Sequence, residues 1–181
     1  MQNTTAILIN RYRLTESSLI VRWCSAEYGI FKTVAKGALR PKSEFSGRLD
    51  LYVSCEVSFL PNTKSDLHTL KEVRLAEPRL GLRDAYSRVL AATYFCELVS
   101  MVVELETPLP EIYELIQKAL DHLAGRDPTP RLLVRFETRL SEILGLGNAE
   151  QGGAERLEEA FHHRLPTQRD DLLKEIARIR P

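Results

Sequence analysis

The sequence of 181 residues lacks the motifs that mark the common enzyme classes. It contains no GxxxxGK[ST] or GxGxxG phosphate loop, no GxSxG nucleophile motif and no HExxH zinc motif. Its three cysteines, Cys24, Cys55 and Cys96, stand far apart and form no CxxC pair. His162 and His163 are adjacent, so on a helix they would point in different directions and make a poor metal site. We therefore expect no enzymatic activity, no metal site and no cofactor.

Long hydrophobic runs and a targeting segment are also absent. The most apolar stretch, 89–103, is interrupted by Glu97 and is shorter than the about 20 residues that a membrane-spanning helix needs. Residues 1–10 have neither the basic region nor the cleavage site of a secretory signal. An odd number of isolated cysteines is typical of reduced intracellular thiols. We therefore expect a cytoplasmic protein that makes no use of a membrane.

The first part of the chain has the pattern of a small β-barrel. Five short segments, 5–9, 18–24, 30–35, 51–60 and 67–75, are rich in β-branched and aromatic residues and are bounded by turn residues. Within 51–60 apolar residues alternate with Tyr52, Ser54, Glu56 and Ser58, which predicts that these four side chains point outward. Five such strands predict a closed barrel of the OB-fold type, and an SH3-like barrel is the alternative.

After residue 77 the apolar residues recur at helical spacing. The segments 82–104, 110–123, 129–144, 154–163 and 168–178 predict five helices, separated by breaks that contain proline or glycine. The expected architecture is therefore α+β. A five-stranded OB-fold domain for nucleic-acid binding occupies residues 1–77, and an all-α helical domain occupies residues 78–181.

A formal net charge of zero conceals an uneven distribution of charge. Residues 1–76 contain 11 basic and 7 acidic side chains, and residues 11–48 contain eight basic and three acidic ones with aromatic residues among them. Cations neutralise phosphates, and aromatic rings stack unpaired bases, so this combination is typical of a surface that binds single strands. The candidate DNA-binding residues are Arg11, Arg13, Lys32, Lys36, Arg40, Lys42, Phe45 and Arg48.

The sharpest part of this charged region is the segment 36–42 (KGALRPK). Its glycine and proline predict a loop that projects three cations from the rim of the barrel. An ordinary solvated loop on a barrel of another function is the alternative. Phe45 lies among polar residues and is the preferred stacking candidate, whereas Trp23 and Phe31 lie in predicted strands and are expected in the core.

A second basic feature lies in the third predicted helix. Arg131, Arg135 and Arg139 are spaced four residues apart and line one face, and apolar residues occupy an adjoining face. A basic ridge beside an apolar groove would bind an acidic peptide with an apolar tip. The alternative is a solvated helix face on which the arginines pair with acids such as Glu137 and Glu142, and the sequence favours this alternative.

Several residues together resemble a known family. They are the pair at 16–17 (ES) between two predicted strands, the segment 34–49 (VAKGALRPKSEFSGRL), the helical segment 92–98, the triplet at 135–137 (RFE) and the pair at 144–145 (LG). From about residue 5 to residue 147 the chain is similar to the bacterial recombination mediators of the RecO family.

This resemblance implies a fold and a function. It implies an N-terminal OB-fold, a helical C-terminal domain, and the binding of single- and double-stranded DNA with annealing of complementary strands. The implied partners are RecR and the acidic C-terminal tail of the single-strand binding protein SSB, and the implied role is to help load RecA onto SSB-coated DNA. The resemblance involves no catalytic residue.

The sequence also departs from the family pattern. Leu39 and Glu44 stand where relatives often carry cations, so we expect weaker and less salt-dependent DNA binding. The segment 147–153 contains no cysteine where many relatives have a zinc-binding cluster, so we expect a shortened helical domain without a zinc module. These departures motivate a second hypothesis, a protein-interaction adapter for RecR or the SSB tail with weak or lost DNA binding.

Overall fold

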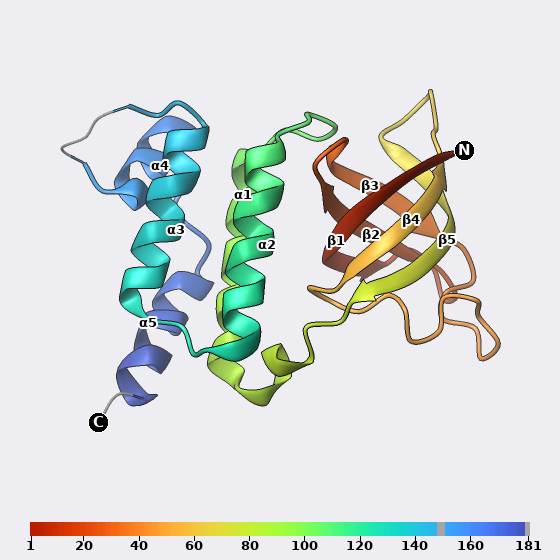
Figure 1. Cartoon of the computed structure of the whole chain (residues 1–181). Coiled ribbons are helices and arrows are strands. Elements are labelled where there is room, and N and C mark those ends of the chain that lie inside the picture. Colours follow the sequence, from red (N-terminus) through yellow and green to blue (C-terminus); the bar gives the residue numbers. More distant parts are fainter. Residues whose placement is uncertain (148–150, 180–181) are drawn as a thin grey trace. The chain divides into compact units, whose positions relative to one another are not determined.

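The computed structural model describes residues 1–147 and 151–179, and in this part it contains a five-stranded barrel and five α-helices (Figure 1). The strands are β1 (Gln2–Arg13), β2 (Leu19–Ser25), β3 (Gly29–Ala35), β4 (Ser54–Leu60) and β5 (Leu67–Glu77). The 3-10 helix η1 (Leu80–Asp84) precedes α1 (Tyr86–Val102), α2 (Pro110–Gly125), α3 (Pro130–Ile143), α4 (Gly153–Phe161) and α5 (Gln168–Ile179). The chain forms two compact units, Met1–Pro78 with Val103–Tyr113, and Arg79–Val102 with Glu114–Pro181.

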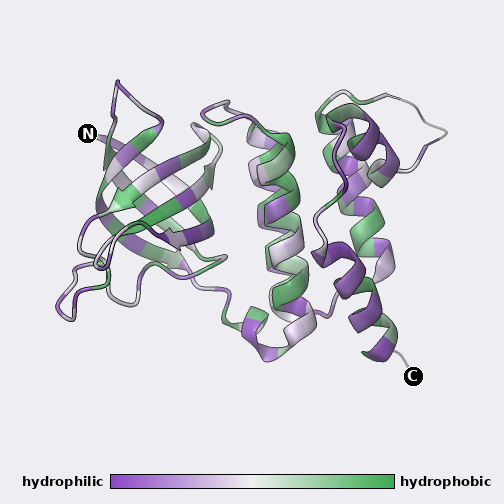
Figure 2. Cartoon of the chain, turned by 180° about the vertical axis from the view of Figure 1, so that it is seen from behind, coloured by the Kyte–Doolittle hydropathy of each residue, from purple (hydrophilic) through white to green (hydrophobic). Residues whose placement is uncertain are grey.

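The strands close into a barrel in the order β1-β2-β3-β5-β4. Neighbouring strands pair antiparallel, except that β3 and β5 run parallel from the pair Lys32 and Leu67 to the pair Val34 and Thr69. A closed five-stranded barrel with this order has the OB-fold topology, which confirms the predicted fold class. Hydrophobic and hydrophilic residues alternate along these strands, as Figure 2 shows.

Aromatic side chains fill the centre of the barrel. Trp23 and Phe31 are buried, as predicted, and the rings of Phe31 and Phe59 stack with their centroids 4.9 Å apart. The indole nitrogen of Trp23 donates a hydrogen bond of 2.8 Å to the hydroxyl of Thr33. The only polar atom of the indole is therefore satisfied inside the barrel, where an unpaired donor would be costly.

Strand β4 is shorter than the predicted strand 51–60, because it begins at Ser54. Tyr52, which was predicted to point outward, is 6% exposed, and its backbone has a left-handed φ of 68°. Its amide donates to the carbonyl oxygen of Leu8 at 2.7 Å. A left-handed residue breaks the alternation of an extended chain, so the prediction for Tyr52 is wrong. Ser54 is also buried, whereas Glu56 is exposed as predicted.

The barrel unit contains a segment from far along the chain, Val103–Tyr113, between α1 and α2. The amide of Glu106 donates to the carbonyl oxygen of Ile30 at 2.8 Å. Gly29 has a positive φ, and a Cβ atom at this position would overlap the carbonyl oxygen of Thr107. A barrel domain that ends at residue 77 therefore omits a segment of the same compact unit. The segment is short and irregular, so no periodic pattern in the sequence predicts that it belongs to the barrel unit.

The helical unit follows the predicted pattern closely. The five predicted segments match α1 to α5 with ends that differ by a few residues, as is usual for helix boundaries. Thr129 caps α3, because its hydroxyl accepts a hydrogen bond from the amide of Leu132. Within the described ranges, no helix combines the length and the apolarity that crossing a membrane requires.

A buried polar cluster joins three helices of this unit. The hydroxyl of Tyr94 on α1 donates to the carboxylate of Glu137 on α3 at 2.6 Å. The guanidinium of Arg169 on α5 donates to the same carboxylate at 2.7 and 3.2 Å. Burial raises the pKa of the Tyr94 hydroxyl, and the charge of Glu137 raises it further. The cluster is thus a neutral phenol and an arginine that share one carboxylate.

Candidate nucleic-acid interface

The segment 36–48, which we call the rim loop, is a chain of tight turns at one end of the barrel. Five amides donate to carbonyl oxygens three residues earlier at 3.0–3.4 Å, and they are those of Ala38, Arg40, Ser43, Ser46 and Arg48. Gly37 has a φ of 70°, a value that glycine adopts without strain. The loop is therefore an ordered structure on the barrel.

The rim loop lies against the turn between β1 and β2. The amide of Leu39 donates to the carbonyl oxygen of Ser17 at 3.0 Å, and the amide of Gly37 donates to the hydroxyl of Ser18 at 3.3 Å. Strand pairing places Arg13 opposite Leu19 and Leu19 opposite Ala35. The end of β1, the start of β2 and the start of the rim loop therefore meet at one edge of the barrel.

Four predicted residues at this edge are exposed cations. They are Arg13, Lys36, Arg40 and Lys42. In the described part of the chain, none of the four takes part in an ion pair. Their charges are therefore available to phosphates, and we call this set the basic rim.

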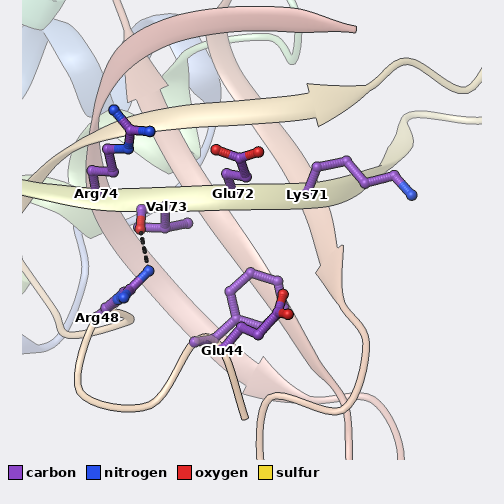
Figure 3. A pocket seen from close by; sticks show the side chains of 7 residues that line it. Glu44, Arg48, Lys71, Glu72, Val73 and Arg74 are labelled. Carbon is purple, nitrogen blue, oxygen red and sulfur yellow. Dashed lines mark hydrogen bonds between the residues drawn. The ribbon is translucent and has the colours of Figure 1, made fainter.

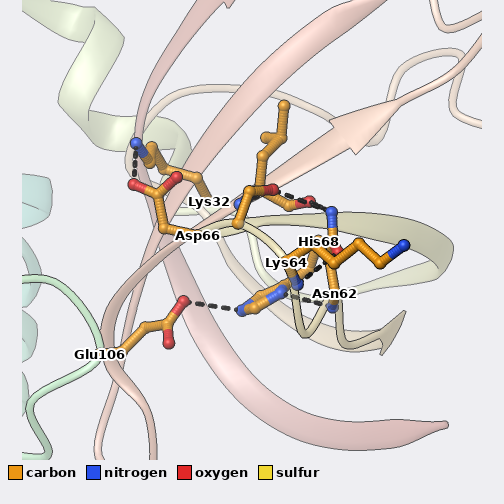
Figure 4. A network of polar contacts seen from close by, with 8 residues as sticks. Lys32, Asn62, Lys64, Asp66, His68 and Glu106 are labelled. Atoms are coloured by element: carbon orange, nitrogen blue, oxygen red, sulfur yellow. Dashed lines mark hydrogen bonds and ion pairs between the residues drawn. The ribbon is translucent and has the colours of Figure 1, made fainter.

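Two other predicted cations serve the barrel itself. The ammonium of Lys32 lies 2.5 Å from the carboxylate of Asp66, and its side chain is 19% exposed (Figure 4). The hydrogen bond from Lys32 lowers the pKa of Asp66. The guanidinium of Arg11 donates to the carbonyl oxygen of Leu49, just beyond the rim loop, and lies 3.9 Å from the carboxylate of Asp50. Arg11 therefore holds the end of the loop.

The outer face of β2 and β3 carries several apolar side chains. In many OB-folds this face and the neighbouring loops bind oligonucleotides. Here Ile20 and Val34 are each 9% exposed, and Cys24 and Ile30 are almost fully buried. Burial also raises the pKa of the Cys24 thiol to about 12. Exposed cations of the barrel lie at its rim and on β5.

The remaining two predicted residues, Phe45 and Arg48, border a hollow of about 360 Å³ (Figure 3). Phe45 is half-buried and packs against the barrel core. Arg48 donates to the carbonyl oxygen of Val73 at 3.2 Å. The opposite wall belongs to β5 and includes Lys71 and Arg74.

Sequence reasoning missed Lys71 and Arg74 as functional candidates. Strand pairing places Ser58 opposite Glu72 and Phe59 opposite Leu70, so Lys71 has no partner and forms a β-bulge. Bulges redirect side chains, and the alternation within β5 gives no sign of this one. The only signal in the sequence was the presence of two basic residues within the predicted strand 67–75.

The arginines of α3 are exposed, and part of the apolar face beside them packs within the helical unit. Arg139 pairs with Glu142 at 3.1 Å, as the alternative interpretation predicted, and Arg131 and Arg135 are exposed. On the adjoining apolar face Phe136 and Leu140 are buried, Leu132 and Ile143 are half-buried, and Phe136 stacks on Phe95 with a centroid distance of 4.0 Å. Glu137 is also buried, so it does not pair with this basic face as the same interpretation expected.

No metal centre is visible in the part of the chain that the structure describes. Across 1–147 and 151–179, no group of three or more His, Cys, Asp or Glu side chains has the arrangement of a metal site. The three cysteines are free and buried. Three residues of the cysteine-free segment, 148–150, lie outside the described residues.

Comparison with known proteins gives the family. The N-terminal domain of recombination protein O matches residues 1–79, and the C-terminal domain of recombination protein O matches residues 83–155. The chain belongs to the recombination protein O family. In terms of this family, the basic rim lies in the N-terminal domain, the α3 arginines lie in the C-terminal domain, and α5 lies beyond both.

Curated relatives carry the name DNA repair protein RecO. The chain is 27% identical over 146 residues to the protein of Rhodopirellula baltica, covering 81% of this chain and 54% of the relative. It is 33% identical over 144 residues to that of Aliivibrio salmonicida, covering 77% and 57%. For Symbiobacterium thermophilum the identity is 32% over 148 residues, covering 80% and 57%. The chain spans about half the length of these curated relatives.

Proposed function

We propose that the chain binds unpaired DNA through the basic rim and acts in DNA repair without a catalytic step. The observation that carries this proposal is the set of four exposed cations, Arg13, Lys36, Arg40 and Lys42, which lack ion pairs within the described residues and lie at one edge of an OB barrel. Each phosphate that they neutralise releases counterions, which favours binding at low salt.

The wider role follows from the family. Recombination protein O membership supports a part in recombinational repair, in which the chain anneals complementary strands and helps load RecA onto SSB-coated DNA together with RecR. An open rim suits annealing, because a strand held by its phosphates leaves its bases free for pairing. The same cations would also bind the phosphates of double-stranded DNA. Three buried free thiols accord with a cytoplasmic location.

Binding and annealing assays test this proposal. Fluorescence anisotropy of a labelled single strand should show binding by the full chain, and a duplex competitor should displace the strand. Annealing of two complementary strands should accelerate. The triple variant Lys36→Ala, Arg40→Ala and Lys42→Ala should lose both activities, while Lys174→Ala with Arg178→Ala on α5 should keep them. An equal loss in both variants would contradict the proposal.

A second candidate function rests on Val134, whose side chain is 54% exposed between Arg131 and Arg135. An apolar side chain flanked by arginines is suited to an acidic peptide with an apolar end, such as the tail of SSB. The chain would then act mainly as an adapter. Arg135→Ala should weaken binding of that peptide relative to Lys118→Ala, and equal binding by both variants would remove this candidate.

A further inference from the structure

We propose that the hollow between the rim loop and β5 holds a single nucleotide of an unpaired DNA strand. The base would lie against Phe45, and the adjacent phosphates would lie on Arg48, Lys71 and Arg74. This inference rests on the proposed function and assigns a second contact to the bound strand beyond the basic rim.

The hollow has the size of a small-ligand site. Its volume of about 360 Å³ falls within the range of about 300–1,000 Å³ that is typical of such sites. One wall consists of Glu44, Phe45 and Arg48 of the rim loop, and the other consists of the β5 residues 71–74. Because the rim loop belongs to both surfaces, a DNA strand that binds the basic rim can extend along the loop into the hollow.

An aromatic ring borders this space in a fixed position. Phe45 packs against the barrel core, and its amide donates to the hydroxyl of Ser43 at 3.2 Å. The next turn closes when Arg48 donates its amide to the carbonyl oxygen of Phe45 at 3.1 Å. Aromatic rings bind unpaired bases by stacking without much regard to sequence. A ring held in this way loses little conformational freedom when a base binds.

Three cations surround the hollow. Lys71 and Arg74 line it from β5, and Arg48 lines it from the rim loop; in Figure 3 the side chains of Arg74 and Lys71 extend away from each other, and Arg48 lies on the other side of β5 from the Arg74 guanidinium. One nitrogen of Arg48 binds the carbonyl oxygen of Val73. In the described chain, neither Lys71 nor Arg74 forms an ion pair. Cations that line the hollow at separate positions along β5 can bind successive phosphates of one strand.

Two carboxylates, those of Glu44 and Glu72, also line the hollow and decide between possible ligands. They would repel the carboxylates of an acidic peptide and the phosphates of a nucleotide alike, so the base of a bound nucleotide must lie against them and its phosphates on the cations. The two carboxylates would accept hydrogen bonds from the exocyclic amino groups of bases, as acidic side chains do with cytosine. The geometry therefore favours a nucleotide over an acidic peptide and cytosine over thymine. A base in a duplex has its pairing edge occupied, so the strand must be unpaired.

Photocrosslinking of the full chain tests this site directly. An oligonucleotide that carries 5-iodocytosine, which keeps the amino group of cytosine, forms a covalent bond on irradiation with an aromatic ring stacked on that base, and mass spectrometry then locates the bond. We expect a crosslink at Phe45. Crosslinks elsewhere, with none at Phe45, would overturn the nucleotide site and leave the proposed function intact. A chain that binds no single-stranded DNA would overturn both.

Matched variants provide an independent readout. Lys71→Ala with Arg74→Ala should reduce the slope of log affinity against log salt by about 1.4, because two phosphate contacts are lost. Lys174→Ala with Arg178→Ala removes the same charge from α5 and should leave the slope unchanged. Equal slopes for the two double variants would overturn the assignment of the β5 cations. Displacement of the oligonucleotide from the wild type by an acidic peptide, sensitive to Lys71→Ala, would identify a peptide site instead.

Further variants test the stacking on Phe45 and the role of the two carboxylates. Phe45→Leu preserves apolar packing and should lower single-strand affinity at least about fivefold, whereas Tyr86→Leu, an exposed aromatic of the helical unit, should not. An equal effect of both would overturn the stacking role. The wild type should bind oligo-dC about threefold or more tightly than oligo-dT, and Glu44→Ala with Glu72→Ala should abolish this difference. A wild type without the preference would overturn the role of the two carboxylates.

Discussion

The ammonium of Lys32 and the carboxylate of Asp66 lie 2.5 Å apart and join β3 to the start of β5. Because its charge is already paired, Lys32 is not available to bind a phosphate of DNA. The ion pair also stabilises the parallel contact between the two strands. A basic residue in the middle of a basic segment can thus be structural. Which cations bind DNA depends on which ones are already paired.

Replacing Asp66 should make the stability of the barrel less dependent on pH. The hydrogen bond from Lys32 lowers the pKa of Asp66 in the folded state, so its stabilising effect is present above the unfolded pKa of about 3.9 and is lost as the pH falls through the folded pKa. Asp66→Asn should therefore lower Tm at pH 7, and the difference in Tm should shrink as the pH falls below about 3.9. Thermal unfolding of both proteins over this range tests it, and a constant difference in Tm would contradict it.

Lys32 and Lys36 should differ in their effect on DNA binding, although they are four residues apart. Lys32 is paired with Asp66, whereas Lys36 is exposed and unpaired within the described residues. Lys36→Ala should weaken single-strand binding at low salt, and Lys32→Ala should change it little while lowering Tm. Anisotropy titrations below the unfolding range of both variants provide the measurement. A larger loss of affinity from Lys32→Ala would show that the ion pair opens on binding.

Much of the fold could be predicted from the sequence, because alternation and helical spacing are local signals. They placed Trp23 and Phe31 in the core and found all five helices. Local patterns could not show the left-handed residue at Tyr52, which depends on a hydrogen bond to another strand. They also could not show that Lys32 is paired, because its partner lies 34 positions away in the sequence.

The candidate site was predicted only in part, because local patterns are visible in the sequence and long-range contacts are not. The rim loop was visible as a basic segment with glycine and proline, and its exposed cations Lys36, Arg40 and Lys42 lie where the pattern placed them. Lys71 and Arg74 come near the loop only through the closure of the barrel. Apolar spacing also suggested a groove on α3, and periodicity alone cannot distinguish an open groove from a face packed within the same unit.

Glu137 should be essential to the stability of the helical unit. Its carboxylate accepts from the hydroxyl of Tyr94 and from the guanidinium of Arg169, and it is 1% exposed. Glu137→Ala leaves both donors without this acceptor and should cost about 3–5 kcal/mol in the free energy of unfolding. Glu142→Ala on the exposed face of the same helix should cost about 0–1 kcal/mol. Urea unfolding measures both values, and equal costs would contradict the account.

Gly29 should tolerate no side chain. Its φ is 62°, and a Cβ atom would overlap the carbonyl oxygen of Thr107. Gly47 also has a positive φ but has open space around it, so Gly47→Ala should cost about 1–2 kcal/mol. Gly29→Ala should cost at least about 2 kcal/mol more, because the segment Val103–Tyr113 must move. Chemical denaturation of the two variants compares them, and similar costs would show that this segment is held loosely.

The most direct test of the central claim is the salt dependence of single-strand binding by the wild type and by the triple variant Lys36→Ala, Arg40→Ala and Lys42→Ala. Each phosphate contact contributes about 0.7 to the slope of log affinity against log salt for a single strand. If the basic rim binds DNA, the slope of the triple variant should be lower than that of the wild type by about two. Identical slopes and affinities would contradict the account, because the cations of the rim loop would then make no contact with phosphates.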